Sequence, residues 1–146
     1  MQGYYPLFTA IPLGMAFFNL LITKVSKRVT DLLAFIAMAC LALMSVMMLF
    51  QEPFSYQVGS WRPPLGILLV SDGLSSVMLL IINGIGFLSL IYSMKYMTTY
   101  TAKPKFYTLF LLMVAGMNGV VITGDMFNLY VFLEIASLAS YALVGF

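Results

Sequence analysis

A single acidic residue, Glu134, lies near the middle of the apolar run from Met126 to Phe146. It comes nine residues after Asp125. In an α-helix that rises about 1.5 Å per residue, Glu134 would lie roughly 13 Å deeper than Asp125. An acid at that depth of a bilayer costs at least about 2.5 kcal/mol unless it is protonated, paired or hydrated. A carboxyl group balanced between burial and a nearby cation can take up and release protons, so Glu134 is the first candidate for chemistry.

Hydroxyl groups share the predicted helix face of Glu134. Positions three, four and seven residues apart lie on one face of an α-helix, and around Glu134 they give Tyr130, Ser137 and Tyr141. Hydroxyls in line with a carboxylate can hold ordered water and pass protons along it, so the pattern predicts a polar path. The alternative is that Glu134 only hydrogen-bonds a neighbouring helix. Because acids inside membranes are functional by default, we favour proton transfer.

Two further aspartates precede apolar runs. Asp125 stands where a helix N-cap belongs, since its carboxylate can accept free backbone N–H groups and suits the helix dipole. A role for Asp125 at the outer mouth of an ion path is the alternative. Asp72, in the stretch VSDGLSS, is expected to cap the next helix in the same way. Asn83 and Asn118 lie among glycines, which predicts close helix packing with an interhelical hydrogen bond.

The composition indicates which solvent surrounds these residues. Of 146 residues, 62% are hydrophobic and only 8% are charged, against roughly 25% charged in soluble domains. A chain this short cannot bury so much apolar surface in its own core, so the bilayer is the expected solvent. Histidine is absent and Cys40 is the one cysteine, which excludes histidine–metal sites and a disulfide framework. We expect no cofactor, no bound metal and no nucleic-acid partner.

Five continuous apolar runs predict an all-α membrane protein in which residues 1–146 form a single transmembrane domain. Each run is close to the roughly 20 residues that an α-helix needs to cross a bilayer. The first ten residues contain no lysine or arginine, so we interpret the first run as a retained span and not as a secretory signal. The predicted helices are approximately 4–23, 32–50, 73–92, 106–123 and 126–146.

The charges of the connections predict the orientation. Six of the seven basic residues fall in the first and third connections, which are expected to be loops: Lys24, Lys27, Arg28, Lys95, Lys103 and Lys105. Because cytoplasmic connections are enriched in lysine and arginine, the N-terminus should face outside and Phe146 should lie inside. In the second connection Tyr56, Val58 and Trp61 roughly alternate before Pro63 and Pro64, which predicts a small outer β-hairpin between the second and third helices.

Two long stretches carry a resemblance to a known family. VSDGLSSVMLLIINGIGFLSLIYSMKYM and GMNGVVITGDMFNLYVFLEIASLASYALVGF resemble the antiporter-like membrane subunits, namely the D-type and A-type subunits of Mrp Na⁺/H⁺ antiporters and their relatives in complex I and membrane-bound hydrogenases. The resemblance implies that the five runs match helices one to five of such a subunit. It also implies that Glu134 takes the place of the glutamate in a Glu/Lys pair that drives proton movement. The lysines of that relay lie on later helices, so this chain would offer Glu134 no cationic partner.

The leading hypothesis is a short, truncated antiporter-like subunit of a multi-subunit membrane complex that moves H⁺ and Na⁺. The complex would be an Mrp-type antiporter or a hydrogenase-like or respiratory machine in a prokaryotic plasma membrane, with other membrane subunits and lipid as partners. The chain would not be catalytic by itself, although it could belong to an ion-translocating oxidoreductase. The alternative is a structural subunit that packs between neighbours without conducting ions. A small multidrug/proton exchanger fits five helices with an acid on the last one poorly.

Overall fold

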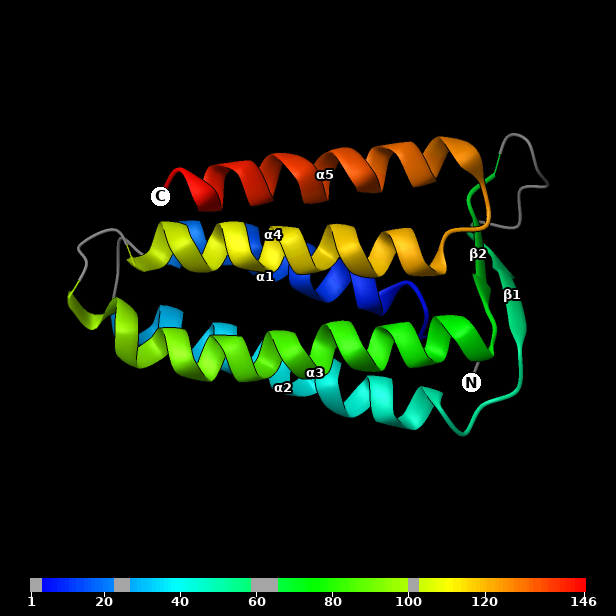
Figure 1. Cartoon of the computed structure of the whole chain (residues 1–146), viewed down its shortest axis with the longest axis horizontal. Coiled ribbons are helices and arrows are strands. Elements are labelled where there is room, and N and C mark those ends of the chain that lie inside the picture. Colours follow the sequence, from blue (N-terminus) through cyan, green and yellow to red (C-terminus); the bar gives the residue numbers. More distant parts are fainter. Residues whose placement is uncertain (1–3, 23–26, 59–65, 100–102) are drawn as a thin grey trace.

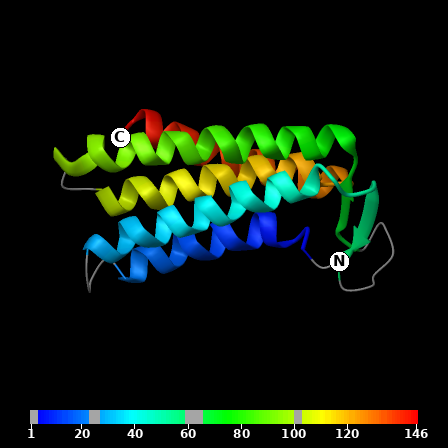
Figure 2. The same cartoon turned by 90° about the horizontal axis from the view of Figure 1, so that it is seen from below.

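The computed structural model describes residues 4–22, 27–58, 66–99 and 103–146. Within these residues the chain forms a bundle of five α-helices with a small β-sheet at one end (Figures 1 and 2). In Figure 1 the last three helices form a front layer, and the first two lie behind it. The helices are α1 (Leu7–Ile22), α2 (Lys27–Met48), α3 (Gly73–Tyr96), α4 (Lys103–Ile122) and α5 (Met126–Val144).

Several helices extend beyond the apolar runs that predicted them. α2 begins at Lys27, α3 continues to Tyr96, and α4 begins at Lys103. The expectation that these basic residues lie in loops is therefore wrong for five of them, which belong to helix ends: Lys27, Arg28, Lys95, Lys103 and Lys105. The physical reason is that lysine is a good helix former, and backbone hydrogen bonding continues past the point where apolar residues stop.

Four of the five helices are long and apolar enough to cross a membrane, and α1 is the exception. It has only 16 residues, because Pro6 and the turn before it delay the helix until Leu7. At about 1.5 Å per residue such a helix is some 24 Å long, which is less than the roughly 30 Å of hydrocarbon in a bilayer. The prediction of five full-length spans is thus met by four helices, with α1 as a shorter apolar helix.

The connection between α2 and α3 contains the small sheet. Strands β1 (Phe54–Gln57) and β2 (Leu68–Ser71) pair antiparallel, with Phe54 opposite Ser71. The predicted β-pairing in this connection is present, while Trp61, Pro63 and Pro64 lie outside the described residues. The sheet packs at the end of the bundle where α4 turns into α5 (Figure 1).

A buried polar cluster joins α1, α3 and α4. The side-chain amides of Asn83 and Asn118 exchange two hydrogen bonds of 3.1 and 3.0 Å, which is the interhelical bonding that the sequence predicts. Asn118 Nδ2 also donates to the Phe8 carbonyl oxygen at 3.1 Å. Pro12 lies inside α1 and has no N–H, so the Phe8 carbonyl four residues earlier lacks its helical donor. Asn118 supplies the missing hydrogen bond from another helix.

Candidate functional site

The start of α5 is fixed by the side chain of Asp125, which is the N-cap of that helix. Asp125 Oδ1 accepts from the Asn128 N–H at 2.8 Å, and Oδ2 accepts from Asn128 Nδ2 at 2.7 Å. Oδ2 also accepts from the Leu68 N–H of β2 at 3.3 Å. One carboxylate thus joins the first turn of α5 to the sheet.

The turn before α5 packs against the same strand through its backbone. The Gly124 N–H donates to the Leu68 carbonyl at 2.7 Å, and Thr123 pairs with Leu69 as an isolated β-bridge. A Cβ on Gly124 would lie 2.6 Å from Val70 Cγ2, so a larger residue could not keep this contact. β2 therefore sets the position from which α5 begins.

Along its length α5 packs mainly against α4. Gly116 of α4 lies directly against the backbone of Ala136, where an added Cβ would be 2.6 Å from the Ala136 nitrogen. One turn further along α4, Gly119 lies against the ring of Phe132. These glycines allow a close helix crossing, as small residues do in membrane bundles.

This crossing determines where Glu134 points. Glu134 is two residues from Phe132 and two from Ala136, which places it about 200° around the helix from each. It therefore lies on the face of α5 opposite α4, near the middle of the 19-residue helix, and its side chain is exposed in this chain. Tyr130 and Tyr141, with exposed fractions of 63% and 72%, lie on the same open side.

Only part of the predicted polar path along α5 is joined by side-chain contacts. The Tyr130 hydroxyl lies close enough to the Glu134 carboxylate to interact with it. Ser137 is half-buried, and its backbone carbonyl accepts a hydrogen bond from Ser140 Oγ at 2.8 Å. In the described part of the chain no hydrogen bond joins the side chain of Ser137 or Tyr141 to Glu134. The structure thus brings Tyr130 to Glu134 and leaves the other two hydroxyls apart from it.

The two capping aspartates are fixed by hydrogen bonds. Burial opposes the charge of Asp125, but the hydrogen bonds from Asn128 and Leu68 outweigh it and hold the pKa of this carboxyl below its usual range. Asp72 is the N-cap of α3 and accepts from the Ser75 N–H at 2.7 Å. That bond lowers the pKa of Asp72. Both carboxylates are therefore engaged with their own helix starts.

No lysine or arginine pairs with Glu134 among the residues that the structure describes. The ion pair within this part of the chain lies elsewhere, between Lys103 and Asp31. That pair was not predicted from the sequence, because Lys103 was expected in a loop and Asp31 was given no role. The link from Asn118 to Phe8 was not predicted either, although Pro12 in an apolar run was a usable signal for an unpaired carbonyl four residues earlier.

Comparison with known families identifies relatives of this chain. Residues 56–107 match the family model described as NADH-ubiquinone oxidoreductase (complex I), chain 5 N-terminus. The chain is 40% identical to the N subunit of NADH-quinone oxidoreductase from Desulforudis audaxviator, in a match that covers 100% of this chain and 31% of that protein. It is 47% identical to the D-type subunit of a probable K⁺/H⁺ antiporter from Rhizobium meliloti, over 61% of this chain and 16% of that protein.

Solved structures give the same result. A chain of the membrane-bound sulfane sulfur reductase, an archaeal respiratory membrane complex, superposes with a TM-score of 0.87 and 31% identity, covering 94% of this chain and 29% of that one. A chain of the Mrp complex from Dietzia sp. DQ12-45-1b superposes with a TM-score of 0.83 and 28% identity, over 97% of this chain and 27% of that one.

The chain therefore spans less than a third of the length of each of these relatives. Its apolar helices and its relatives in membrane complexes mark it as a multi-pass membrane protein. The resemblance that the sequence predicts is confirmed, and the chain is related to the antiporter-like membrane subunits of complex I and of Mrp-type cation/proton antiporters.

Proposed function

We propose that this chain forms part of an antiporter-like subunit in a multi-subunit membrane complex that translocates protons and sodium ions. The complex is an Mrp-type antiporter or a respiratory or hydrogenase-like machine of a prokaryotic plasma membrane. The similarity of the whole chain to subunits of both kinds of complex supports this proposal. Residues 1–146 act as one transmembrane domain, with the N-terminus and the sheet outside and Phe146 inside, in keeping with the charges of the connections.

In this proposal Glu134 carries the proton. The observation that supports it best is the position of Glu134 at mid-helix, on a face of α5 that none of the described helices covers. A carboxylate facing lipid there would cost at least about 2.5 kcal/mol. A neighbouring protein surface with a cation, polar groups or water removes that cost. We infer that α5 presents Glu134 to such a surface, as the family resemblance to a Glu/Lys pair implies.

The other predicted site residues take different parts. The Tyr130 hydroxyl lies close enough to the Glu134 carboxylate to interact with it, and in this proposal it is the first hydroxyl to exchange a proton with Glu134. Ser137 and Tyr141 extend the polar face toward the C-terminal end of α5, where the neighbouring surface and its water would have to connect them. Asp125 and Asp72 serve as helix caps and not as an ion mouth, since their carboxylate oxygens already accept backbone N–H groups.

The alternative function is a structural subunit. It is favoured by the large apolar side chains that α5 exposes beside Glu134, including Phe127, Leu133 and Leu138, since such a face suits packing against a neighbour. In that case Glu134 would be held in a static hydrogen bond.

A substitution of Glu134 by glutamine separates the two functions, because it keeps the shape of the side chain and one acceptor oxygen and removes its titratable proton. The assembled complex would be reconstituted into vesicles and its ion-driven proton movement measured. Glu52→Gln, at an exposed acid before β1, is the matched control. We expect Glu134→Gln to abolish transport while assembly persists, and the control to leave transport unchanged. Transport at the wild-type rate in Glu134→Gln would favour the structural subunit.

A further inference from the structure

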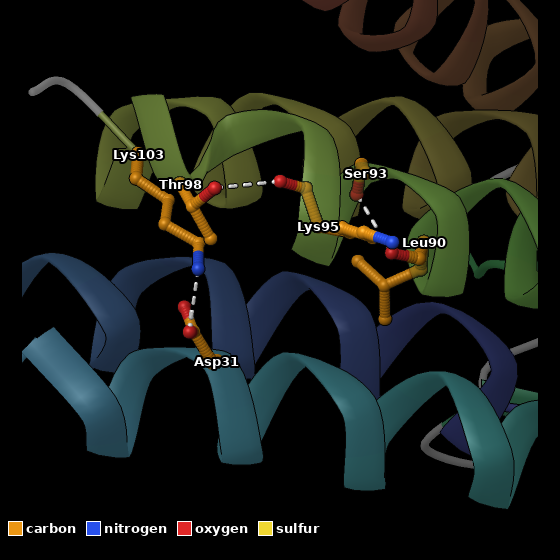
Figure 3. Close-up of polar contacts among 6 residues, drawn as sticks. All are labelled: Asp31, Leu90, Ser93, Lys95, Thr98 and Lys103. Atoms are coloured by element: carbon orange, nitrogen blue, oxygen red, sulfur yellow. Dashed lines mark hydrogen bonds and ion pairs between the residues drawn. The ribbon is translucent and has the colours of Figure 1, made fainter. Parts of the chain in front are cut away.

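A cluster of charged side chains lies away from Glu134, at the end of the bundle opposite the sheet. Lys103 at the start of α4 and Asp31 of α2 point toward one another and form an ion pair, with 2.6 Å between Nζ and Oδ2 (Figure 3). The two residues are 72 positions apart in the sequence. Their side chains are only 16% and 23% exposed, so the pair is mostly buried between the helices.

A buried tyrosine completes this cluster. Tyr107 follows Lys103 by one helical turn and is fully buried. Its ring centroid lies 5.8 Å from Lys103 Nζ, and its hydroxyl faces the Asp31 carboxylate. The three side chains thus share one contact region made by α2 and α4.

Two oxygens of the cluster lack hydrogen-bond partners. Asp31 Oδ1 and the Tyr107 hydroxyl are both buried, and neither makes a hydrogen bond of ordinary distance and angle among the described residues, although the hydroxyl lies close enough to the Asp31 carboxylate to interact with it. Two other hydroxyls behave differently: Ser93 in α3 and Thr98 just after that helix donate to the carbonyls of Leu90 and Lys95 (Figure 3). Because buried polar atoms in proteins are nearly always satisfied by protein or by ordered water, the pair of oxygens points to a ligand.

We propose that Asp31, Lys103 and Tyr107 bind one buried water molecule, and that this hydrated site exchanges protons with the aqueous phase at the basic end of the bundle. The basic end is the end opposite the sheet, where the lysines of α3 and α4 lie. A buried water needs two to four polar partners. Asp31 Oδ1 accepts from it, the Tyr107 hydroxyl bonds to it, and Lys103 has N–H donors beyond the one that Asp31 uses. The ammonium group of Lys103 disfavours a metal cation at the same carboxylate, so water is the ligand that fits.

The site would exchange protons in a simple step. A hydronium ion at the basic end gives a proton to the bound water, which passes one of its own protons to Asp31 Oδ1. The products are the neutral carboxylic acid, the bound water and the water molecule that the hydronium ion leaves behind, and release follows the reverse order. The proton exchange at this site rests on the proposed function, whereas the binding of water does not.

Removal of the Tyr107 hydroxyl tests the site with little change of shape. Density maps of the assembled complex, at a resolution that shows ordered water, would be compared for the wild type and Tyr107→Phe. We expect a water peak within hydrogen-bond distance of both Asp31 Oδ1 and the Tyr107 hydroxyl in the wild type, and its loss in the variant. A wild-type map without that peak would overturn the proposal whatever the complex transports.

Transport by the same preparations tests proton exchange. Loss of one bridging hydrogen bond of typical strength predicts proton movement about three- to tenfold slower in Tyr107→Phe. Tyr92→Phe, which removes an exposed hydroxyl from α3, is the control and should transport normally. If Tyr107→Phe transports as fast as this control while Glu134→Gln is inactive, the proton-exchange role fails and the proposed function stands.

A double variant tests the role of the ion pair itself. Asp31→Asn alone would leave the charge of Lys103 buried without its partner and could prevent folding. Asp31→Asn combined with Lys103→Gln removes both charges together and leaves a polar side chain at each position. We expect this variant to assemble and to move protons at least as slowly as Tyr107→Phe, because it also removes the carboxylate that takes the proton. Normal transport by the assembled double variant would contradict the proton-exchange role.

Discussion

The link between Asn118 and the carbonyl of Phe8 gives the sharpest prediction of stability. Asn118→Leu keeps the size of the side chain but removes three hydrogen bonds: two with Asn83 and one with Phe8. Interhelical hydrogen bonds in membranes average about 0.6 kcal/mol each, so we expect a loss of about 2 kcal/mol in the free energy of unfolding. Asn83 keeps its own bond to the Leu79 carbonyl, which limits the loss.

The role of Pro12 can be isolated by a double-mutant cycle. Pro12→Ala restores a backbone N–H that can donate to the Phe8 carbonyl within α1. In that background Asn118→Leu no longer leaves the carbonyl unsatisfied, so its effect should be smaller by about 0.6–1.5 kcal/mol. The assay is equilibrium unfolding of the purified chain in mixed detergent micelles, followed by its helical signal. A coupling energy of zero between the two substitutions would show that Asn118 does not replace the helical donor that Pro12 removes.

Two further predictions concern the placement of α5. Gly116→Ala should destabilise the chain by about 1–3 kcal/mol, since the added Cβ meets the backbone of Ala136; Gly84→Ala, where no atom lies within 4 Å, should be neutral or stabilising by up to about 1 kcal/mol in the same unfolding assay. A similar loss in both variants would argue against the close crossing of α4 and α5. Asp125→Ala should cost about 1 kcal/mol at neutral pH through the lost helix cap. Because the folded-state pKa of Asp125 is lowered, its contribution is present above the unfolded-state pKa of about 4 and is lost as pH falls through the folded-state value. Unfolding measured against pH should therefore show a smaller acid-induced loss of stability in Asp125→Ala than in the wild type, and equal slopes would contradict this assignment.

Much of the fold could be predicted because lipid leaves few alternatives. Continuous apolar runs must form helices that satisfy their own backbone, and this gave the positions of all five helices. Aspartates before such runs have a strong preference for helix caps, and Asp72 and Asp125 occupy that position. The ends of the helices were harder to predict, because the sequence shows where apolar residues stop and not where helical hydrogen bonding stops.

The contacts between distant segments could not be read from local patterns. Nothing near Asp31 in the sequence indicates Lys103, and nothing near Leu68 indicates that Asp125 and Gly124 will pack against it. The helix periodicity did group Tyr130 with Glu134, which the structure brings together. It could not show that this face of α5 points away from α4, because that direction depends on the glycines of another helix.

The surroundings of Glu134 in the assembled complex decide whether this carboxyl group can carry a proton. A density map of that complex would show which atoms lie within hydrogen-bond distance of the carboxyl group. We predict a basic or polar side chain, ordered water, or both, on the side of α5 opposite α4. A carboxyl group surrounded only by lipid chains and apolar side chains would contradict the proposed role of Glu134.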